Sequence, residues 1–224
     1  MTQHPHADFA GPATDFTPVR IRDSVRRLLE AEELPPIVQA GHPVLRQRAA
    51  EYDGQLDASE LEAFIELMRV VMHAAPGVGL AAPQLGVPLQ LAVLEDKYEL
   101  DPASAAERHR EPLEFMAVLN PTYRPLGSET ASFYEGCLSV VGYQAVVTRL
   151  RNVELNYTDP EGRAVEEWFS GWQARIVQHE TDHLHGTLYL DRAEMRSLSS
   201  NGEHAARWAQ PDIAEARRTL GFLC

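Results

Sequence analysis

The segment at residues 179–183, with the sequence HETDH, constrains the fold more than any other part of the chain. It has the H-E-x-x-H pattern of catalytic metal sites, and in an α-helix residues four apart share a face. His179 and His183 can therefore contact one metal ion. Glu180 follows the first imidazole, where its carboxylate can accept a proton from a nucleophilic water. The pattern predicts a helix with one polar, metal-binding face; the alternative is a polar helix with two surface histidines.

The composition is that of a globular protein with one main domain. The chain has 224 residues, of which 44% are hydrophobic and 24% charged, which is enough to bury a core. It has no apolar run long enough to span a membrane and no signal-peptide segment, so no membrane partner is expected. The net charge of −13 disfavours direct binding to nucleic acid. Two cysteines, Cys137 and Cys224, form no disulfide framework, so the cytoplasm is the expected compartment.

Hydrophobic periodicity predicts a helix and several strands before the metal motif. Apolar residues three and four apart over 61–72 predict an amphipathic helix, which Ser59 and Glu62 cap and Pro76-Gly77 ends. A strong turn at 159–162 predicts a hairpin between the last two strands. Strands without β-α alternation indicate an α+β fold, in which antiparallel strands pack around the central helix that carries the metal motif. The strand-like runs are 89–94, 115–119, 143–147, 153–157 and 164–168.

The remaining segments suggest how the chain is divided. Residues 1–20 lack periodicity and predict a mobile tail, and a short helix is expected over 23–33. Residues 95–112 are charged and Ala-rich, which indicates a loop or insertion, and a last helix is expected over 213–220. The predicted parts are an N-terminal extension (1–40), a catalytic domain (41–192) and a C-terminal tail with a short helix (193–224).

A catalytic metal site needs a third protein ligand, and Cys137 is the best candidate. Downstream of His183 the nearest acids are Asp191 and Glu194, and the longer metzincin pattern is absent. Upstream, Cys137 lies in the sequence EGCLS at 135–139, between predicted strands, where its thiolate can face a metal. A buried, unreactive cysteine is the alternative interpretation.

A third segment, GVGLAAPQ at residues 77–84, allows the three patterns to be interpreted together. Glycines let a backbone approach a ligand closely, and Gln84 offers an amide donor, although a plain tight turn also fits. Together with 135–139 and QHETDH at 178–183, this segment makes the chain resemble the peptide deformylase family. The three family motifs, GφGφAAxQ, EGCxS and QHExDH, occur here in order. The resemblance extends from about residue 41 to residue 192.

The resemblance implies a hydrolase that removes the N-formyl group from the formyl-methionine of a newly made polypeptide and releases formate. The implied partners are therefore N-formyl-Met nascent peptides and the ribosome near its exit tunnel, in a cytoplasm of bacterial type. One divalent metal is expected, held by Cys137, His179 and His183 with water in the fourth position. Fe²⁺ is the family's usual metal, while Zn²⁺, Ni²⁺ and Co²⁺ also suit such ligands.

The resemblance also implies roles in catalysis and substrate binding. Glu180 takes a proton from the attacking water, and the Gln84 amide and Leu138 N–H stabilise the developing oxyanion. An apolar pocket is expected for the methionine side chain, and the backbone at Gly79 is expected to pair with the substrate as an added strand. Glu135 is expected to pair with Arg149, either bracing the Cys137 loop or as a surface ion pair. The residues expected at the substrate are Val78, Gly79, Glu135, Gly136, Trp172 and Ile176; simple core packing is the alternative for Val78, Trp172 and Ile176.

The chain departs from the common family pattern at three places. Val140-Val141 replaces a hydrophobic residue followed by proline, Gln144 replaces a frequent arginine, and His42 replaces a frequent aspartate. These changes affect substrate affinity rather than the reaction. Two other functions compete with deformylation: a zinc endopeptidase that uses the same H-E-x-x-H pattern, and a non-catalytic metal-binding relative that docks near the ribosomal exit.

Overall fold

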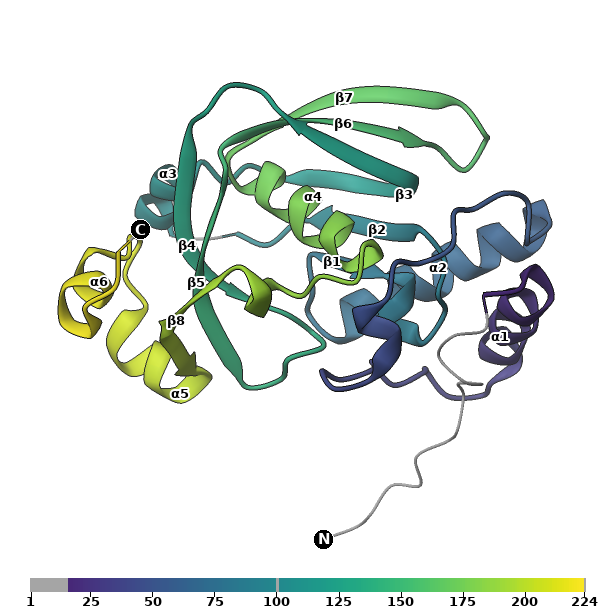
Figure 1. The fold of residues 1–224 in the computed structure, drawn as a ribbon, viewed down its shortest axis with the longest axis horizontal. Coiled ribbons are helices and arrows are strands. Elements are labelled where there is room, and N and C mark those ends of the chain that lie inside the picture. The colour runs from purple at the N-terminus through teal and green to yellow at the C-terminus, as the bar shows by residue number, and fades with distance from the viewer. Residues whose placement is uncertain (1–15, 100, 224) are drawn as a thin grey trace, which may run out of the picture.

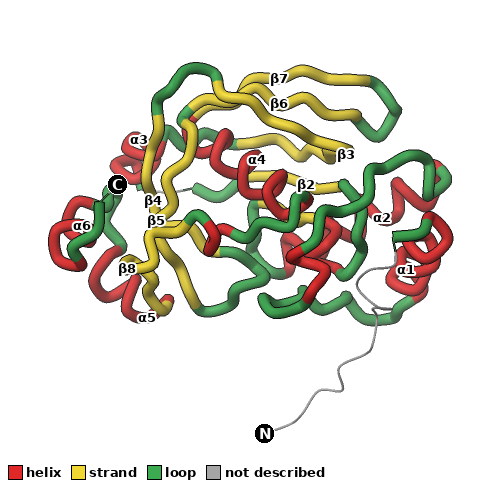
Figure 2. Tube along the Cα trace, viewed as in Figure 1, coloured by secondary structure: helices red, strands yellow, loops and turns green. Residues whose placement is uncertain are grey.

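The computed structural model describes residues 16–99 and 101–223, so most of the predicted mobile tail lies outside the described residues. A single helix, α4 (Gly171–Leu184), packs against strands of two antiparallel sheets (Figures 1 and 2). The larger sheet has the strand order β1-β2-β3-β6-β7, and the smaller has the order β4-β5-β8. The α+β prediction, with antiparallel strands around a central helix that carries the metal motif, is confirmed.

The larger sheet contains four of the five predicted strands. The predicted hairpin is present, with Ala164 opposite Thr158 and Ser170 opposite Asn152. Apolar side chains of this sheet and of α4 form one buried cluster, which includes Leu94, Leu155 and Ile176. The strands are β1 (Gly79–Ala81), β2 (Leu91–Asp96), β3 (Leu113–Pro125), β6 (Asn152–Thr158) and β7 (Ala164–Ser170).

The smaller sheet contains two strands that the sequence patterns do not predict. It consists of β4 (Thr130–Gly136), β5 (Tyr143–Leu150) and β8 (Ala193–Ser200). Because β8 pairs with β5, the predicted C-terminal tail begins as part of this sheet. The β8 sequence AEMRSLSS has no β-branched apolar residue, so its strand conformation depends on pairing with β5 rather than on propensity.

The N-terminal helices pack together on one side of the molecule. Helix α1 (Pro18–Glu30) lies on α2 (Ala58–Ala74), and their apolar faces form a second cluster with residues of β1 and β2 (Figure 1). The predicted cap of α2 is wrong: Asp57 and Glu60 form the capping box, with Asp57 Oδ1 accepting from Glu60 N at 3.0 Å. Ser59 instead donates its hydroxyl to Asp57.

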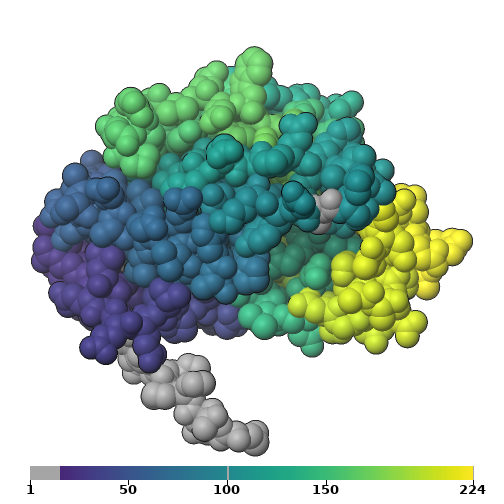
Figure 3. All heavy atoms as spheres, turned by 180° about the vertical axis from the view of Figure 1, so that it is seen from behind, coloured from purple at the N-terminus to yellow at the C-terminus, as the bar shows by residue number. Residues whose placement is uncertain are grey.

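The remaining helices are short. The predicted loop over 95–112 contains α3 (Pro102–Arg108), which Asp101 caps at its start. Beyond β8, α5 (Asn201–Glu203) and α6 (Ala214–Leu220) follow at the opposite end of the molecule from α1 (Figure 3). Among the residues described, no helix is both long and apolar enough to cross a membrane.

Candidate active site

Helix α4 carries a polar stripe into the interior, which is unusual for a helix between sheets. Ser170 occupies its N-cap position in extended conformation, and His185 is its C-cap. Gln178 fixes the helix to the end of β5: its Oε1 accepts from Leu150 N at 3.2 Å, and its Nε2 donates to Leu150 O at 2.9 Å. The family motif alone gives Gln178 no role, and the structure assigns it this one.

Cys137 and the two histidines of the motif meet at one point. The Sγ of Cys137 and ring nitrogens of His179 and His183 all lie within 4.8 Å of one another. The Cys137 Sγ is 3.2 Å from His183 Nε2, and His183 Nδ1 is buried without a hydrogen-bond partner among the residues described. One sulfur and two imidazole nitrogens form a donor set that suits a divalent metal and leaves a coordination position open.

Burial disfavours the charged form of both imidazoles, but their surroundings differ. Burial lowers the pKa of His183 well below its usual value. Burial also acts to lower the pKa of His179, but hydrogen bonds to Cys137 and Glu135 outweigh it and raise this pKa well above its usual value. The Nδ1 of His179 lies 3.1 Å from Glu135 Oε2. This contact orients the ring so that its other nitrogen can face the Cys137 thiol.

Glu135 is the centre of a buried ion-pair network behind His179. Arg149 donates to both of its oxygens, at 2.6 and 3.0 Å, and Arg175 donates to Oε1. The side chains of Glu135 and Arg149 are only 4% and 2% exposed, so the surface ion-pair alternative is wrong. Burial raises the pKa of Glu135, but Arg149, His179 and Arg175 outweigh this effect and hold it well below its usual range.

Asp182, also without a predicted role, extends this network. It accepts from Arg149 Nη1 at 2.8 Å, from Arg192 Nε at 2.8 Å and from the Tyr123 hydroxyl at 3.0 Å. The carboxylates of Glu135 and Asp182 thus share one buried guanidinium. The shared guanidinium connects β4, β5 and α4 and fixes the segment at 135–139 relative to the metal-binding helix.

The Glu180 carboxylate is buried at the wall of a cavity and has an unsatisfied oxygen. Its Oε2 has no hydrogen-bond partner among the residues that the structure describes, and burial raises its pKa to about 7. A buried carboxyl that titrates near neutrality can both accept and release a proton.

Gln84 and Leu138 lie near the Cys137 thiol but come from different segments. Gln84 Oε1 accepts from Ala81 N at 2.8 Å, which directs its Nε2 to Ser139 Oγ at 3.1 Å and to Cys137 Sγ at 3.7 Å. The Leu138 N–H makes no hydrogen bond within the described part of the chain. Both residues line the cavity.

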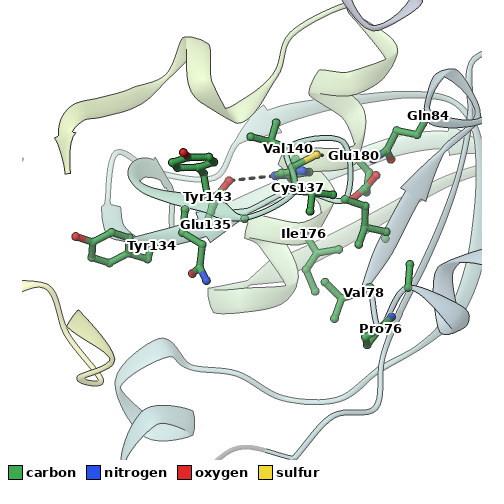
Figure 4. Close-up of a pocket in the computed structure, with 18 of the residues that line it drawn as sticks. Pro76, Val78, Gln84, Tyr134, Glu135, Cys137, Val140, Tyr143, Ile176 and Glu180 are labelled. Carbon is green, nitrogen blue, oxygen red and sulfur yellow. Dashed lines mark hydrogen bonds and ion pairs between the residues drawn. The ribbon is translucent and has the colours of Figure 1, made fainter. Parts of the chain in front are cut away.

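The cavity has a volume of about 620 Å³ and is open to solvent. Figure 4 shows the side chains of residues that line it, among them Cys137, Glu180 and Gln84. Except for His183, all the predicted site residues line it, including the six expected at the substrate. Ile176 belongs to the α4 core cluster, and Val78 and Trp172 pack against that cluster, so these three side chains serve both core and cavity.

Several cavity residues were not predicted from the sequence. Arg175 had a usable signal, because it lies one helical turn before His179. Arg108 of α3 had none; its guanidinium carbon lies 5.3 Å from the Trp172 ring centroid. Ile37, Gln39 and Asn201 are distant in sequence from the motifs, and their approach depends on tertiary packing. The others flank or belong to the motif segments, and Gly77, Val140, Val141 and Gln144 were already singled out there: Ala75, Pro76, Gly77, Tyr134, Val140, Val141, Gly142, Tyr143 and Gln144.

Comparisons with known proteins are consistent across sequence and structure. The family model described as polypeptide deformylase matches residues 34–199. Peptide deformylase 3 of Streptomyces avermitilis is 53% identical over 216 residues, which cover 96% of each chain. The human mitochondrial peptide deformylase is 40% identical over 184 residues, covering 79% of this chain and 76% of that one. The actinonin-bound class I type b peptide deformylase of Acinetobacter baumannii has a TM-score of 0.62 at 31% identity, covering 73% of this chain and 100% of that one.

Proposed function

The chain belongs to the peptide deformylase family, and from this premise we propose which of its residues carry out the hydrolysis. The reaction removes the N-formyl group from the formyl-methionine of a newly made polypeptide and releases formate. One observation carries the assignment: the Cys137 thiol and two imidazoles converge within 4.8 Å beside a cavity that the Glu180 carboxylate also lines.

Cys137, His179 and His183 would hold one divalent metal. The bound metal supplies Lewis-acid chemistry at the reacting carbonyl. We propose Fe²⁺ as the native ion, because it is the family's usual metal; the same three ligands also suit Zn²⁺, Ni²⁺ and Co²⁺. Glu135 supports this site by orienting the His179 ring, and Arg149 and Arg175 keep Glu135 ionised.

Glu180 acts as the proton carrier of the reaction. It accepts a proton from the attacking water and delivers it to the amine that leaves. The Gln84 Nε2 and the Leu138 N–H stabilise the negative charge that develops on the formyl oxygen. These two donors belong to separate segments that both line the cavity, so their relative placement determines how well they act together.

The substrate binds along the edge of the larger sheet. Strand β1 is the end strand of this sheet, so its outer edge, which includes Gly79, is free to pair with an extended peptide. The methionine side chain enters the apolar part of the cavity between Val78, Trp172 and Ile176. Glu135 and Gly136 line the adjoining wall. We place this reaction in a bacterial cytoplasm, near the ribosomal exit, where formylated chains appear.

A zinc endopeptidase receives no support from the geometry. That function requires a third ligand downstream of His183, but among the described residues the metal-binding group takes Cys137, upstream, as its third member. The nearest downstream acid, Asp191, forms an ion pair with Arg46 and accepts from Leu188 N at 2.8 Å. The Asp191 carboxylate is therefore bound to Arg46 and to the Leu188 N–H and does not act as a ligand beside the two histidines.

Formate release from formyl-Met-Ala-Ser tests the proposal. The protein is prepared without oxygen and loaded in parallel with Fe²⁺, Ni²⁺ or Zn²⁺. Glu180→Gln should retain the metal and lose turnover, whereas Cys137→Ser should lose metal affinity. Unchanged formate release by Glu180→Gln would show that the assignment of the proton carrier is wrong.

A further inference from the structure

Residues 37–40, which we call the bridging segment, precede the predicted catalytic domain but reach its centre. Ile37 and Gln39 line the cavity. Along the backbone, Val38 N donates to Gln84 O at 2.8 Å, and Ala40 N donates to Ser139 O at 2.7 Å. Two residues of the bridging segment are thus bonded to two different motif segments.

The Gln39 side chain adds a second set of contacts to one of these segments. Its Nε2 donates to Leu138 O at 3.1 Å and to Ile37 O at 3.0 Å. Its Oε1 accepts from Val141 N at 3.4 Å. Residues 137–140 form a turn, in which Val140 N donates to Cys137 O at 2.9 Å. The Gln39 amide therefore contacts this loop at Leu138, within the turn, and at Val141, just after it.

These bonds join the two segments that carry the proposed oxyanion donors, both to each other and to the bridging segment. Gln84 Nε2 donates to Ser139 Oγ at 3.1 Å, and Val38 and Ala40 bond to the backbones of the same two segments. The Leu138 carbonyl that Gln39 holds belongs to the cavity-lining residue whose N–H is the proposed oxyanion donor. Gln39 holds the peptide group that follows Leu138, and Val140 N, through Cys137 O, holds the peptide group that contains the Leu138 N–H. Fixing both peptide groups restricts rotation of that N–H.

We propose that Gln39 is a positioning residue that fixes the Leu138 N–H relative to the Gln84 amide. The proposal rests on the function proposed above. Charge stabilisation by preorganised donors requires each donor to meet the oxyanion at hydrogen-bond distance, and small displacements of a donor cost rate rather than substrate affinity. Gln39 itself is exposed and contributes little to the core, so its effect on rate can be separated from any effect on folding.

The first test is the Gln39→Ala variant with formyl-Met-Ala-Ser. Complete loss of one oxyanion donor costs about 10²–10³ in kcat. Because Ser139 still contacts Gln84, displacement of the Leu138 N–H should be partial, and we expect kcat to fall about tenfold with KM changed less than about twofold. Metal content and the unfolding temperature should remain those of the wild type.

The Gln39→Glu variant tests the donor half of the amide separately from its acceptor half. The carboxylate can still accept from Val141 N but has no N–H for the Leu138 carbonyl, so kcat should fall at least as far as in Gln39→Ala. If Gln39→Ala fails to fold, this variant provides the test alone. Gln55→Ala is the matched control: Gln55 Nε2 donates to Glu51 O at 2.6 Å and its Oε1 accepts from Asp53 N at 2.7 Å, away from the cavity.

The possible results separate this inference from the proposed function. If Glu180→Gln loses formate release and the Gln39 variants keep the wild-type kcat, the positioning role is wrong and the proposed function stands. If the variants change KM alone, the bridging segment binds substrate and does not position the donor. If Gln55→Ala loses as much kcat as Gln39→Ala, the effect is not specific to the loop, and the positioning role is also wrong.

Discussion

Gly79 lies directly against the carboxylate of Glu180, so this position has no room for a side chain. A Cβ built on Gly79 would lie 2.3 Å from Glu180 Oε1 and 2.5 Å from Cδ, well inside van der Waals contact. The strand edge proposed to bind the substrate therefore also limits where the proton carrier can be.

Gly79→Ala should abolish most of the activity while the protein stays folded. The added methyl group must displace the Glu180 carboxylate or β1, and a displacement of about 1 Å at a reacting group can cost about 10²-fold in rate. We expect kcat/KM for formyl-Met-Ala-Ser to fall by about that factor, with metal content retained. Gly202→Ala is the control, because a Cβ there meets no atom within 4 Å. Near-wild-type activity of Gly79→Ala would show that the two residues can separate without cost.

Arg149→Met should destabilise the protein strongly. Arg149 is buried between Glu135 and Asp182, and its removal leaves both carboxylates without their shared guanidinium. Breaking a buried ion pair in this way costs about 3–5 kcal/mol, which urea unfolding would measure. Arg163→Met is the control, because Arg163 is 72% exposed and pairs with Asp159 at the surface; its loss should cost less than about 1 kcal/mol. Equal losses in the two variants would contradict a structural role for the buried network.

Sequence patterns predicted the parts of this molecule that depend on local periodicity. The H-E-x-x-H face, the apolar face of α2 and the hairpin of β6 and β7 all follow from residues near one another in the chain. Strand β8 could not be predicted in this way, because its polar sequence becomes a strand only through pairing with β5.

In the candidate site, too, local sequence patterns predicted some features and long-range contacts determine the others. The motifs predicted which residues converge, but their supporting contacts are long-range. Glu135 meets Arg175, forty positions later, and Gln39 meets Leu138, ninety-nine positions later. No periodicity indicates such a pair, and an exposed glutamine before a turn gives no signal at all. The capping box of α2 failed for a different reason, because Asp57 and Ser59 both fit the start of the helix, and the geometry selects the carboxylate.

Metal addition should raise the unfolding temperature of the metal-free protein, and the size of the rise should depend on the side chains that bind the metal. A ligand that binds the folded state at about 100 times its dissociation constant adds about 2.7 kcal/mol, which appears as a rise in unfolding temperature with Ni²⁺. Cys137→Ser should reduce this rise, and Glu180→Gln should keep it. His73→Ala is the control, because His73 of α2 contacts Glu95 of β2 and lies outside the three-residue group. An undiminished rise in Cys137→Ser would remove Cys137 from the ligand set.

Asp57 should make the stability of α2 dependent on pH in the acid range. Hydrogen bonds from the Glu60 backbone N–H and the Ser59 hydroxyl lower the pKa of Asp57 from 3.8 to about 2. Because the folded-state pKa is the lower one, the ionised carboxylate stabilises the fold fully above pH 3.8, and this contribution is lost as the pH falls towards 2. Asp57→Asn keeps a cap but cannot titrate. The difference in urea midpoint between the wild type and Asp57→Asn should therefore be constant near neutral pH and should shift against the wild type on acidification. A difference that stays constant down to about pH 2 would show that the Asp57 pKa is not lowered in the folded protein.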